Sequence, residues 1–534
     1  MSLFLEGRYA ALTLSAVAMI VLGAIMLFWP ATDYYLWLPA LIAAFLSFVG
    51  VHDIRQTKRS ILRNYPIIGH LRFFLEKIRP EMRQYFFESD EDGAPFPRNK
   101  RAIVYQRAKK QLDKKPFGTH GDVYVEGHEW MLHSMQPAEV AKTLFRVTIG
   151  GPDCKQPYSA SVLNISAMSY GALSANAIQS LNTGAKKGGF AHDTGEGSVS
   201  PFHMAGGGDL IWEIGSGYFG CRNPDGTFSS DKFAVTANNP QIKMIEIKLS
   251  QGAKPGHGGV LPAAKVTQEI AAIRGVDAGK DCISPASHSA FSSPLGLLQF
   301  VKQLRDVSGG KPVGFKLCIG HPAEFLGVVK AMLESGILPD FIVVDGKEGG
   351  TGAAPAEFID NLGMPMRDGL AFVQSTLIGA GLREHIKLGC AGKIITGFDM
   401  ARAHALGADW CNVARGFMFA VGCIQAQSCH TGHCPTGVAT QDPLRQQAIV
   451  VTDKSERVAN FHRETVKSLA ELLAAAGMTS PSDLKPHHIF HRVGDGKTLT
   501  FAQQYPGLEA GVLLHDTVAH ALSAEWALAR ADRF

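Results

Sequence analysis

The longest uninterrupted apolar stretches of the chain lie near its N-terminus. The first runs from Ala10 to Trp29, 20 residues without a charge, and the second from Tyr34 to Val51, interrupted only by Pro39. About 20 apolar residues in a helix cross a hydrocarbon core of about 30 Å. The pattern therefore predicts two membrane-spanning helices joined by a short turn at residues 30–33. A cleaved signal peptide would have a shorter apolar region, and a hairpin buried in a soluble core is the alternative.

The charges that flank these stretches predict their orientation. The turn carries only Asp33, whereas residues 52–118 hold 16 Lys/Arg against 8 Asp/Glu, beginning with Arg55, Lys58, Arg59 and Arg63. Positively charged flanks stay on the cytoplasmic side of a membrane. We therefore expect a hairpin in the inner, cytoplasmic membrane, with everything after residue 52 facing the cytoplasm. The basic segment fits an anionic leaflet or, equally well, an ordinary solvated helical face.

From about residue 155 the pattern changes to short apolar runs that alternate with amphipathic stretches. The predicted strands are 161–166, 191–194, 244–250, 281–284, 313–319, 341–345, 386–389 and 410–414, and the predicted helices between them include 263–274, 294–307, 322–335, 367–380 and 397–406. Eight strands with intervening helices predict an α/β fold, a (β/α)8 TIM barrel, with residues 195–240 as an excursion after the second strand. A doubly wound open sheet is the alternative, but no G-x-G-x-x-G fingerprint follows a first strand.

Four segments follow from these patterns. They are a transmembrane helical hairpin (1–52), a basic juxtamembrane linker (53–150), the barrel (151–450) and a helical C-terminal extension (451–534). Within the extension, residues 453–476 predict an amphipathic helix that stops at Gly477, and another helix is expected near 521–533.

Composition narrows the class of protein. Of 534 residues, 46% are hydrophobic and 19% charged, which excludes a disordered or fibrous chain. The net charge of +4 and the lack of a long basic run interleaved with aromatics argue against a nucleic-acid partner. Glycine, at 57 residues, is enriched, as in chains with tight βα turns and phosphate-binding loops.

Three glycine-containing segments fall at predicted carboxyl ends of barrel strands, where this fold places its chemistry. They are Asp345–Gly352 after the sixth strand, Cys390–Lys393 after the seventh, and Arg415-Gly416 after the eighth. Converging backbone N–H groups and the Thr351 hydroxyl suit a phosphate or a flavin edge. Each segment alone matches an ordinary turn, but together they favour a phosphate-bearing cofactor.

Lysines near strand ends add cationic groups. Lys248, Gln251 and Lys254 end the predicted third strand, and Lys316 lies within the run 313–319. A barrel strand would point Lys316 into the interior, where a buried cation needs an anionic partner. That partner is either the N1–C2=O edge of a reduced flavin or a barrel carboxylate.

Three cysteines lie within 12 residues, at Cys423, Cys429 and Cys434, followed by Pro435. Tightly spaced thiolates are typical of iron–sulfur ligation, and a cytoplasmic location favours metal binding over disulfides. Zinc, with His430 or His433 as a fourth ligand, is the alternative, although the Cys-x2-Cys spacing common in zinc sites is missing.

Residues 160–480 resemble the synthase domain of glutamate synthase. The resemblance rests on five ordered motifs, which are Ser166–Ser174, Asp193–Gly197, Gln251–Gly256, Gly349–Ala353 and the cysteine segment 423–441. It implies an FMN-binding barrel with a 3Fe-4S cluster held by Cys423, Cys429 and Cys434. In that family electrons pass through the cluster to FMN, which reduces the imine of 2-oxoglutarate and ammonia to L-glutamate.

The resemblance also assigns residues. Those that would surround FMN are Ala167, Met168, Ser169, Lys248, Gln251, Lys316, Gly349, Gly350, Thr351, Gly352, Gly392, Arg415 and Gly416. Lys254 and Arg274 match positions that hold the carboxylates of the oxo-acid, a role that suits the two parallel hydrogen bonds an arginine offers. Glu196 is a candidate for proton transfer because its motif ends a strand.

This chain departs from the family pattern near the expected substrate site. His257 and Val260 stand where the family has a Glu and a Gln, and the loop Ser284–Phe291 is altered. We also expect the glutamine-hydrolysing domain and a nucleotide-binding fingerprint to be missing. Expected partners are therefore an oxo-acid or amino-acid substrate, a ferredoxin-like protein or separate reductase subunit, a separate glutaminase, and the membrane.

Two further functions compete with imine reduction. An amine or amino-acid dehydrogenase would pass electrons outward to a membrane or protein acceptor. An electron-relay subunit of a larger complex would retain the cofactors but need no substrate cations; the presence of Lys254, Arg274 and Lys316 argues against it.

Overall fold

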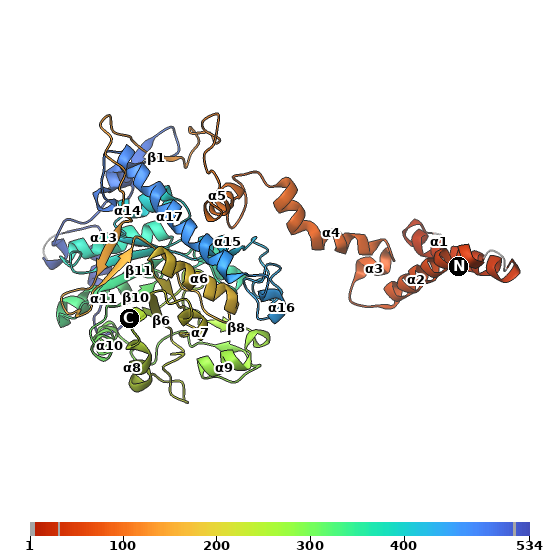
Figure 1. Ribbon diagram of the computed structural model, residues 1–534, viewed down its shortest axis with the longest axis horizontal. Helices are drawn as coiled ribbons and strands as arrows, with labels where there is room; N and C mark the ends of the chain where they lie inside the picture. Colours follow the sequence, from red (N-terminus) through yellow and green to blue (C-terminus); the bar gives the residue numbers. More distant parts are fainter. Residues whose placement is uncertain (1–5, 30–32, 516–518) are drawn as a thin grey trace. The chain divides into compact units, whose positions relative to one another are not determined.

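The computed structural model describes residues 6–29, 33–515 and 519–534, and the chain divides into two units, Met1–Gly93 and Ala94–Phe534 (Figure 1). The first unit is helical. It consists of η2 (Gly7–Tyr9), α1 (Ala10–Phe28), α2 (Asp33–Arg55), α3 (Ser60–Asn64), α4 (Gly69–Met82) and a π-helical continuation, η4 (Arg83–Phe87). The turn predicted between the apolar helices lies largely outside the described residues.

Helices α1 and α2 pack side by side through small residues. Ser47 Oγ donates to Ser15 Oγ at 3.3 Å. A Cβ at Gly50 would lie 2.6 Å from Leu12, so glycine allows the close approach. Both spans, Gly7–Phe28 and Tyr34–Arg55, are long and apolar enough to cross a membrane, and 11% and 17% of their 18-residue apolar windows are buried.

The second unit contains a closed barrel of eight parallel strands. In chain order they are β4 (Leu163–Ile165), β5 (His192–Asp193), β6 (Leu210–Ile214), β7 (Ile242–Lys248), β10 (Val313–Leu317), β11 (Phe341–Asp345), β12 (Lys387–Ala391) and β13 (Trp410–Val413). Strand β13 pairs with β4, with Asn412 opposite Asn164, and closes the barrel. The predicted (β/α)8 fold is confirmed.

Two strands of the prediction were wrong. Residues 210–214, expected in an excursion, form barrel strand β6, in which Glu213 interrupts an otherwise apolar run. Residues 281–284, expected in the barrel, contribute only β9 (Cys282–Ile283), which pairs antiparallel with β8 (Val260–Leu261) outside it. One strand was missed and one was added, so the strands predicted as fifth to eighth are also the fifth to eighth strands of the barrel.

Helices surround the barrel in the order expected for alternating βα units (Figure 1). They are α6 (Ala175–Gly188), α7 (Pro201–Met204), α8 (Ser230–Ala237), α10 (Pro294–Val307), α11 (Pro322–Ser335), α13 (Met366–Gly379), α14 (Gly397–Ala405) and α15 (Arg415–Val421). Between β8 and β9 lie η5 (Ala263–Lys265) and α9 (Gln268–Arg274), and the short α12 (Ala356–Asn361) precedes α13.

One end of the barrel is closed by a hairpin, β2 (Arg146–Ile149) and β3 (Tyr158–Ser161). Its Ile149 and Tyr158 pack on inward-facing barrel residues, among them Trp410 and Phe341. The loops at the carboxyl ends of the strands are therefore left to form the site.

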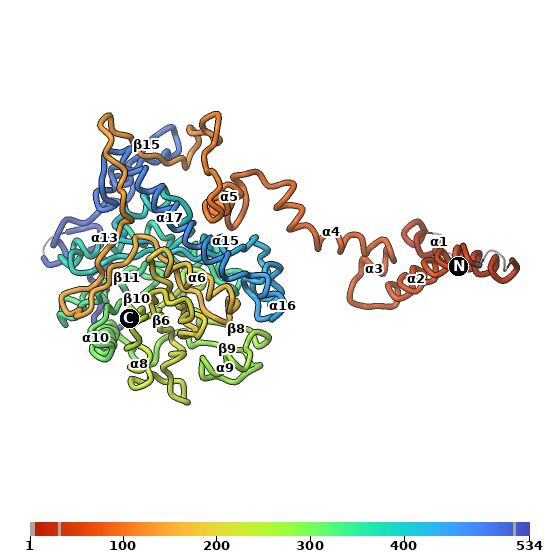
Figure 2. Tube along the Cα trace, viewed as in Figure 1, coloured from red at the N-terminus to blue at the C-terminus, as the bar shows by residue number. Residues whose placement is uncertain are grey.

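The C-terminal extension is only partly helical. Helix α17 (Val451–Ala475) packs along α6, where a Cβ at Gly184 would lie 2.5 Å from Val458, and along α5 (Arg98–Ala108). The short helix α16 (Pro443–Gln446) precedes the extension. After α17 the extension continues with η6 (Pro481–Asp483), η7 (Pro486–His488), β14 (Ile489–Arg492), β15 (Thr498–Thr500), α18 (Phe501–Gln504), η8 (Val512–Leu514) and α19 (Ser523–Leu528). Strands β14 and β15 form a sheet with β1 (Glu129–Met131), so that segments from opposite ends of the unit lie side by side (Figure 2).

The last predicted helix, 521–533, is shorter than expected. Lys330 Nζ donates to the carbonyls of Trp526 and Ala529 at 2.7 and 3.0 Å and so satisfies backbone acceptors at the end of α19.

Candidate functional site

A cavity of about 170 Å³ opens at the carboxyl ends of the barrel strands. All residues predicted for catalysis or for cofactor binding lie in its wall. They are Ala167, Met168, Ser169, Glu196, Lys248, Gln251, Lys254, Arg274, Lys316, Gly349, Gly350, Thr351, Gly352, Gly392, Arg415 and Gly416. Cys429 and His430 also line it, whereas Cys423 and Cys434 do not. Residues from six barrel loops and from α9 thus converge on one space.

Glycines allow the loops around this cavity to approach one another closely. A Cβ at Gly252 would lie 1.8 Å from the Gly346 carbonyl, and a Cβ at Gly350 would lie 2.6 Å from Arg415 Nε. Gly252 N–H donates to Asp345 at 2.8 Å, and Arg415 Nη2 donates to the Thr351 carbonyl at 2.6 Å. The loops after β7, β11 and β13 are therefore fixed to one another.

Backbone donors on two of the cavity loops, those after β11 and β12, have no partner among the described residues. Across the described ranges of the chain, the N–H groups of Gly350, Thr351, Gly352, Gly392 and Lys393 meet no acceptor. Clustered backbone N–H groups at barrel loops form anion-binding concavities. The arrangement fits a phosphate or a flavin edge, the chemistry predicted from the glycines.

One wall of the cavity carries a fixed ion pair. Lys248 Nζ, at the end of β7, lies 3.1 Å from Glu196 Oε2 and 3.3 Å from Gln251 Oε1. Gln251 Nε2 in turn donates to the Gly350 carbonyl at 2.8 Å. Burial alone would raise the pKa of Glu196, but Lys248, followed by Arg274 and Lys254, holds it below its ordinary value. Glu196 is therefore a carboxylate at neutral pH, which disfavours it as a stored proton donor.

A buried histidine supports this wall from behind. Tyr218 O–H donates to His288 Nδ1 at 3.1 Å, and His288 Nε2–H donates to the Lys248 carbonyl at 2.9 Å. Burial lowers the pKa of His288 to about 4, so the ring is neutral near pH 7. The altered loop Ser284–Phe291 thus holds the end of β7 in place.

Lys254 and Arg274 are buried cations without a carboxylate in contact. Their exposed fractions are 3% and 5%. No hydrogen bond or ion pair of Lys254 Nζ occurs within the residues that the structure describes. Arg274 Nη2 donates to the Tyr170 carbonyl at 3.2 Å, its Nε has no partner, and its guanidinium lies 5.2 Å from the centre of the Phe219 ring. Burial lowers the pKa of Lys254, an effect that the nearby Glu196 partly offsets.

His257 and Val260, the two single residues that depart from the family pattern, lie in different surroundings. Val260 lines the cavity. His257 Nδ1 instead bonds to the Gly258 carbonyl at 2.8 Å, and its ring contacts Phe358. Only Val260 is therefore placed to contact a ligand in the cavity directly.

Lys316 is paired with barrel carboxylates, the second of the two kinds of partner expected for it. It forms ion pairs with Glu213 and, at 3.2 Å, with Glu246. Burial alone would lower the pKa of Lys316, but Glu213, Glu246 and Asp193 hold it well above its ordinary value. Burial raises the pKa of Glu246 to about 7 and also raises that of Asp193. Lys316 and Glu213 both reach the cavity wall, so the ion pair and a contact with a cofactor are compatible.

The cysteine loop follows α15. Cys423 Sγ accepts a hydrogen bond from Gln425 N–H at 3.5 Å, and Cys434 Sγ lies 3.5 Å from Thr436 Oγ1. Burial alone would raise the pKa of Cys434, but hydrogen bonds from Thr436 and nearby backbone N–H groups lower it. Burial instead raises the pKa of Cys423 to about 11, so the two thiols differ in how readily they ionise.

Three carboxylates gather around Lys316. In the described part of the chain, the one trio of potential metal ligands with donor atoms within 4.8 Å of one another is Asp193, Glu213 and Glu246, and Lys316 already pairs with two of them. This trio is therefore the anionic environment of a buried lysine.

Two residues at this site were missed by the sequence analysis. Lys265, 3% exposed, donates to the carbonyls of Cys429, Ala172 and Ala439 at 2.8, 3.2 and 3.3 Å and fixes the cysteine loop. Phe96 lines the cavity because its backbone is held on both sides by the Gln425 amide at 3.1 Å. Neither belongs to a motif, so only the three-dimensional structure identifies them.

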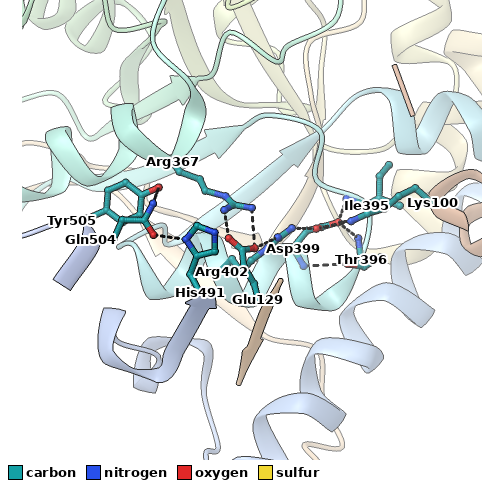
Figure 3. A network of polar contacts seen from close by, with 10 residues as sticks. All are labelled: Lys100, Glu129, Arg367, Ile395, Thr396, Asp399, Arg402, His491, Gln504 and Tyr505. Atoms are coloured by element: carbon teal, nitrogen blue, oxygen red, sulfur yellow. Dashed lines mark hydrogen bonds and ion pairs between the residues drawn. The ribbon is translucent and has the colours of Figure 1, made fainter. Parts of the chain in front are cut away.

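A polar network supports the loop after β12 from outside. Asp399 caps α14 and pairs with Lys100 at 2.7 Å and with Arg402, while Glu129 pairs with Arg402 and Arg367 (Figure 3). Four of them border a second cavity of about 230 Å³, namely Lys100, Arg367, Asp399 and Arg402. This cavity shares Phe96, Glu348, Gly392, Lys393 and Ile394 with the first. Burial alone would raise the pKa of Asp399, but Lys100 and Arg402 lower it to about 2.

Fold and site together define a (β/α)8 enzyme whose cavity is lined by cations and lies beside three clustered thiols. The family model described as the conserved region in glutamate synthase matches residues 147–479. The chain belongs to the glutamate synthase family, and with it to the oxidoreductases that act on CH–NH2 donors.

Individual relatives agree with this assignment. The chain is 38% identical over 494 residues to the glutamate synthase large subunit-like protein YerD of Bacillus subtilis, covering 85% of this chain and 94% of that protein. It is 37% identical over 322 residues to the archaeal glutamate synthase (NADPH) of Methanocaldococcus jannaschii, covering 60% of each. A solved flavocytochrome b2 variant with pyruvate bound is similar at 12% identity and a TM-score of 0.41, covering 78% of this chain and 85% of that one.

Proposed function

We propose that the protein is a membrane-anchored FMN and iron–sulfur oxidoreductase of the glutamate synthase type. It reduces the imine of 2-oxoglutarate, or of a related oxo-acid, and ammonia to an amino acid. The observation that carries the proposal is the pair of buried cations, Lys254 and Arg274, that face the cavity without a carboxylate in contact. A buried cation is stable only with a compensating anion, and a dicarboxylate ligand supplies it.

Lys254 and Arg274 would hold the substrate. The planar guanidinium of Arg274 offers paired donors to one carboxylate, and Lys254, as a point charge, would neutralise the other. Val260 supplies no hydrogen bond at its place in the wall. An oxo-acid with an apolar segment facing Val260 would therefore compete with 2-oxoglutarate.

FMN would be held by the loops with unpaired backbone donors, Gly350–Gly352 and Gly392-Lys393, together with the segment Ala167–Ser169, Gln251, Gly349, Gly416, Arg415 and Lys316. When bound, FMN supplies hydride transfer to the imine carbon. Lys248 would lie close to such a group, and Glu196 and Gln251 fix the position of its ammonium.

Cys423, Cys429 and Cys434 would hold a 3Fe-4S cluster, which supplies one-electron transfer to the flavin site. Cys429 lies in the cavity wall, so a group on this loop would adjoin the flavin site without an intervening element. Lys265 keeps the loop closed by binding three of its neighbouring carbonyls.

Partner molecules would supply electrons and ammonia. The match to the archaeal and archaeal-type relatives that are named for NADPH covers about 60% of their length and about 60% of this chain. A ferredoxin-like protein or a reductase subunit would supply electrons, and a separate glutaminase or free ammonium the nitrogen. Helices α1 and α2 would anchor the protein in the cytoplasmic membrane with the barrel on the cytoplasmic side.

The test uses the full chain, purified anaerobically in detergent. Released flavin, iron and acid-labile sulfide are measured first, in the wild type and in Cys434→Ser, with Cys154→Ser as the control. We expect about one FMN and an iron–sulfide content that Cys434→Ser abolishes and Cys154→Ser leaves unchanged. Iron and sulfide absent from the wild type would contradict the cluster, and absent flavin the whole proposal.

Turnover decides the direction of the reaction. Reduced methyl viologen with 2-oxoglutarate and ammonium should yield glutamate. Reduction of a quinone analogue by glutamate or another amine, without the forward reaction, would instead identify a dehydrogenase. Membrane anchoring is tested by alkaline carbonate extraction, after which the protein should stay in the membrane pellet.

A further inference from the structure

Helix α4 presents an apolar face that the described part of its own unit leaves largely exposed. Five of its apolar residues share this face, namely Leu71, Phe74, Leu75, Ile78 and Met82, whereas Phe73 lies off it and contacts Arg59. Leu71, Phe74 and Leu75 are 57%, 57% and 53% exposed. Helix η4, which follows directly, adds three exposed aromatic residues, Tyr85, Phe86 and Phe87. A run of this size on one helical face indicates an interaction surface.

The charges of the same helix lie on its other side. Arg72, Glu76, Arg79 and Arg83 are exposed there, and Arg72 pairs with Glu76 at 3.0 Å. Residues 54–87 as a whole hold eight Lys/Arg against two Glu. Such a helix, with aromatics on one face and arginines on the other, has the pattern of helices that lie in a membrane interface.

Within its unit, α4 begins where the second apolar helix ends. Asp53, 1% exposed near the end of α2, accepts from Ile67 N–H at 2.9 Å and pairs with His70 at 2.9 Å. A Cβ at Gly69 would lie 2.9 Å from Leu62, so α3 and the start of α4 are also in close contact. The start of α4 is therefore held at the membrane-surface end of α2.

We propose that the face of α4 and η4 lies in the interface of an anionic lipid leaflet, with its apolar side chains at the boundary of the acyl chains. The proposal rests on the proposed membrane anchor formed by α1 and α2. Two observations select lipid as the occupant. The surface is continuous with the candidate spans, and its excess of Lys/Arg complements anionic headgroups.

The test places a tryptophan on each face of α4 in the full chain. Leu75→Trp lies on the apolar face and Glu76→Trp, its neighbour, on the charged one. Each variant is reconstituted in vesicles of phosphatidylglycerol and phosphatidylcholine whose acyl chains carry bromine, and the wild-type emission is subtracted. We expect the added emission of Leu75→Trp to be quenched at least twofold more than that of Glu76→Trp. Replacement of phosphatidylglycerol by phosphatidylcholine should weaken the difference.

The native tryptophans of the hairpin report separately on the anchor. Trp29 and Trp37 are 66% and 62% exposed in their unit and would be quenched if the spans insert. Quenching of these two without a difference between the variants at 75 and 76 would overturn the proposal and leave the anchor standing; the apolar face would then be covered by protein. Failure to quench Trp29 and Trp37 would overturn the anchor, and this proposal with it.

Discussion

Lys248 Nζ lies 3.1 Å from Glu196 Oε2, in the same cavity that Lys254 and Arg274 line. Lys254 and Arg274 have no carboxylate in contact, whereas Lys316, in the same wall, is paired with Glu213. Two buried cations are thus placed to bind the two negative charges of a dicarboxylate such as 2-oxoglutarate. Complementarity of charge, rather than shape, is what the cavity offers most clearly.

Replacement of Lys254 should test this balance. Lys254→Met keeps the apolar part of the side chain and removes its charge. A charge-assisted hydrogen bond contributes about 1.5–3 kcal/mol, so we expect kcat/KM for the oxo-acid to fall roughly 10- to 150-fold, with bound FMN unchanged. Lys280→Met, at a lysine on the surface, is the control. An unchanged kcat/KM in Lys254→Met would exclude the lysine from substrate binding.

Val260→Gln should improve the use of 2-oxoglutarate. Val260 lines the cavity where a glutamine amide would add a hydrogen bond. A net contribution of about 0.5–1.5 kcal/mol predicts a 2- to 10-fold lower KM. Val235→Gln, at an exposed valine, controls for the added amide. A higher KM in Val260→Gln would indicate a substrate other than 2-oxoglutarate, with an apolar group at this place.

Lys316→Met should destabilise the protein even without cofactor. The change leaves Glu213 and Glu246 buried without their cation, and such a loss costs about 3–5 kcal/mol. Denaturant unfolding of the flavin-free protein is the measurement, and Glu246→Gln added to Lys316→Met should restore part of the loss. If flavin is lost while the stability of the flavin-free protein is unchanged, Lys316 serves the cofactor alone.

Asp399 should make stability depend on pH in the acid range. Its pKa of about 2 lies below the ordinary 3.8, so the folded state prefers the carboxylate. The stabilisation, about 2 kcal/mol, is present above pH 4 and is lost as the pH falls from about 4 to about 2. The difference in Tm between the wild type and Asp399→Asn should therefore be largest at pH 5–7 and shrink toward pH 3. A difference that is independent of pH would refute the role of the charge.

Much of the fold could be predicted from local signals. The helices 294–307 and 322–335 match the structure because each begins with a proline, and Ser308 and Gly336 mark where they stop. Strand β6 was missed because Glu213 and the preceding glycines disguise it. Glu213 is tolerated in this buried strand because Lys316, from another strand, pairs with it. Such a contact across the barrel cannot be inferred from a local sequence pattern.

The site residues were predicted where they belong to motifs and missed where they do not. Each glycine loop is a short contiguous stretch of sequence, and so is the segment that holds the three cysteines. Lys265 and Phe96 act through contacts with the cysteine loop from distant segments, and the carboxylates around Lys316 come from four different strands. Such groups become visible only when the barrel brings the strand ends together.

A single turnover of the reduced protein tests the proposed imine reduction. The flavin of the full chain is reduced anaerobically, and 2-oxoglutarate is added together with ammonium labelled with ¹⁵N. We expect the flavin absorbance band to return rapidly and ¹⁵N-labelled glutamate to form in an amount equal to the flavin. Lys254→Met should slow both. A flavin band that stays bleached with 2-oxoglutarate and with related dicarboxylate oxo-acids would contradict the proposed reaction.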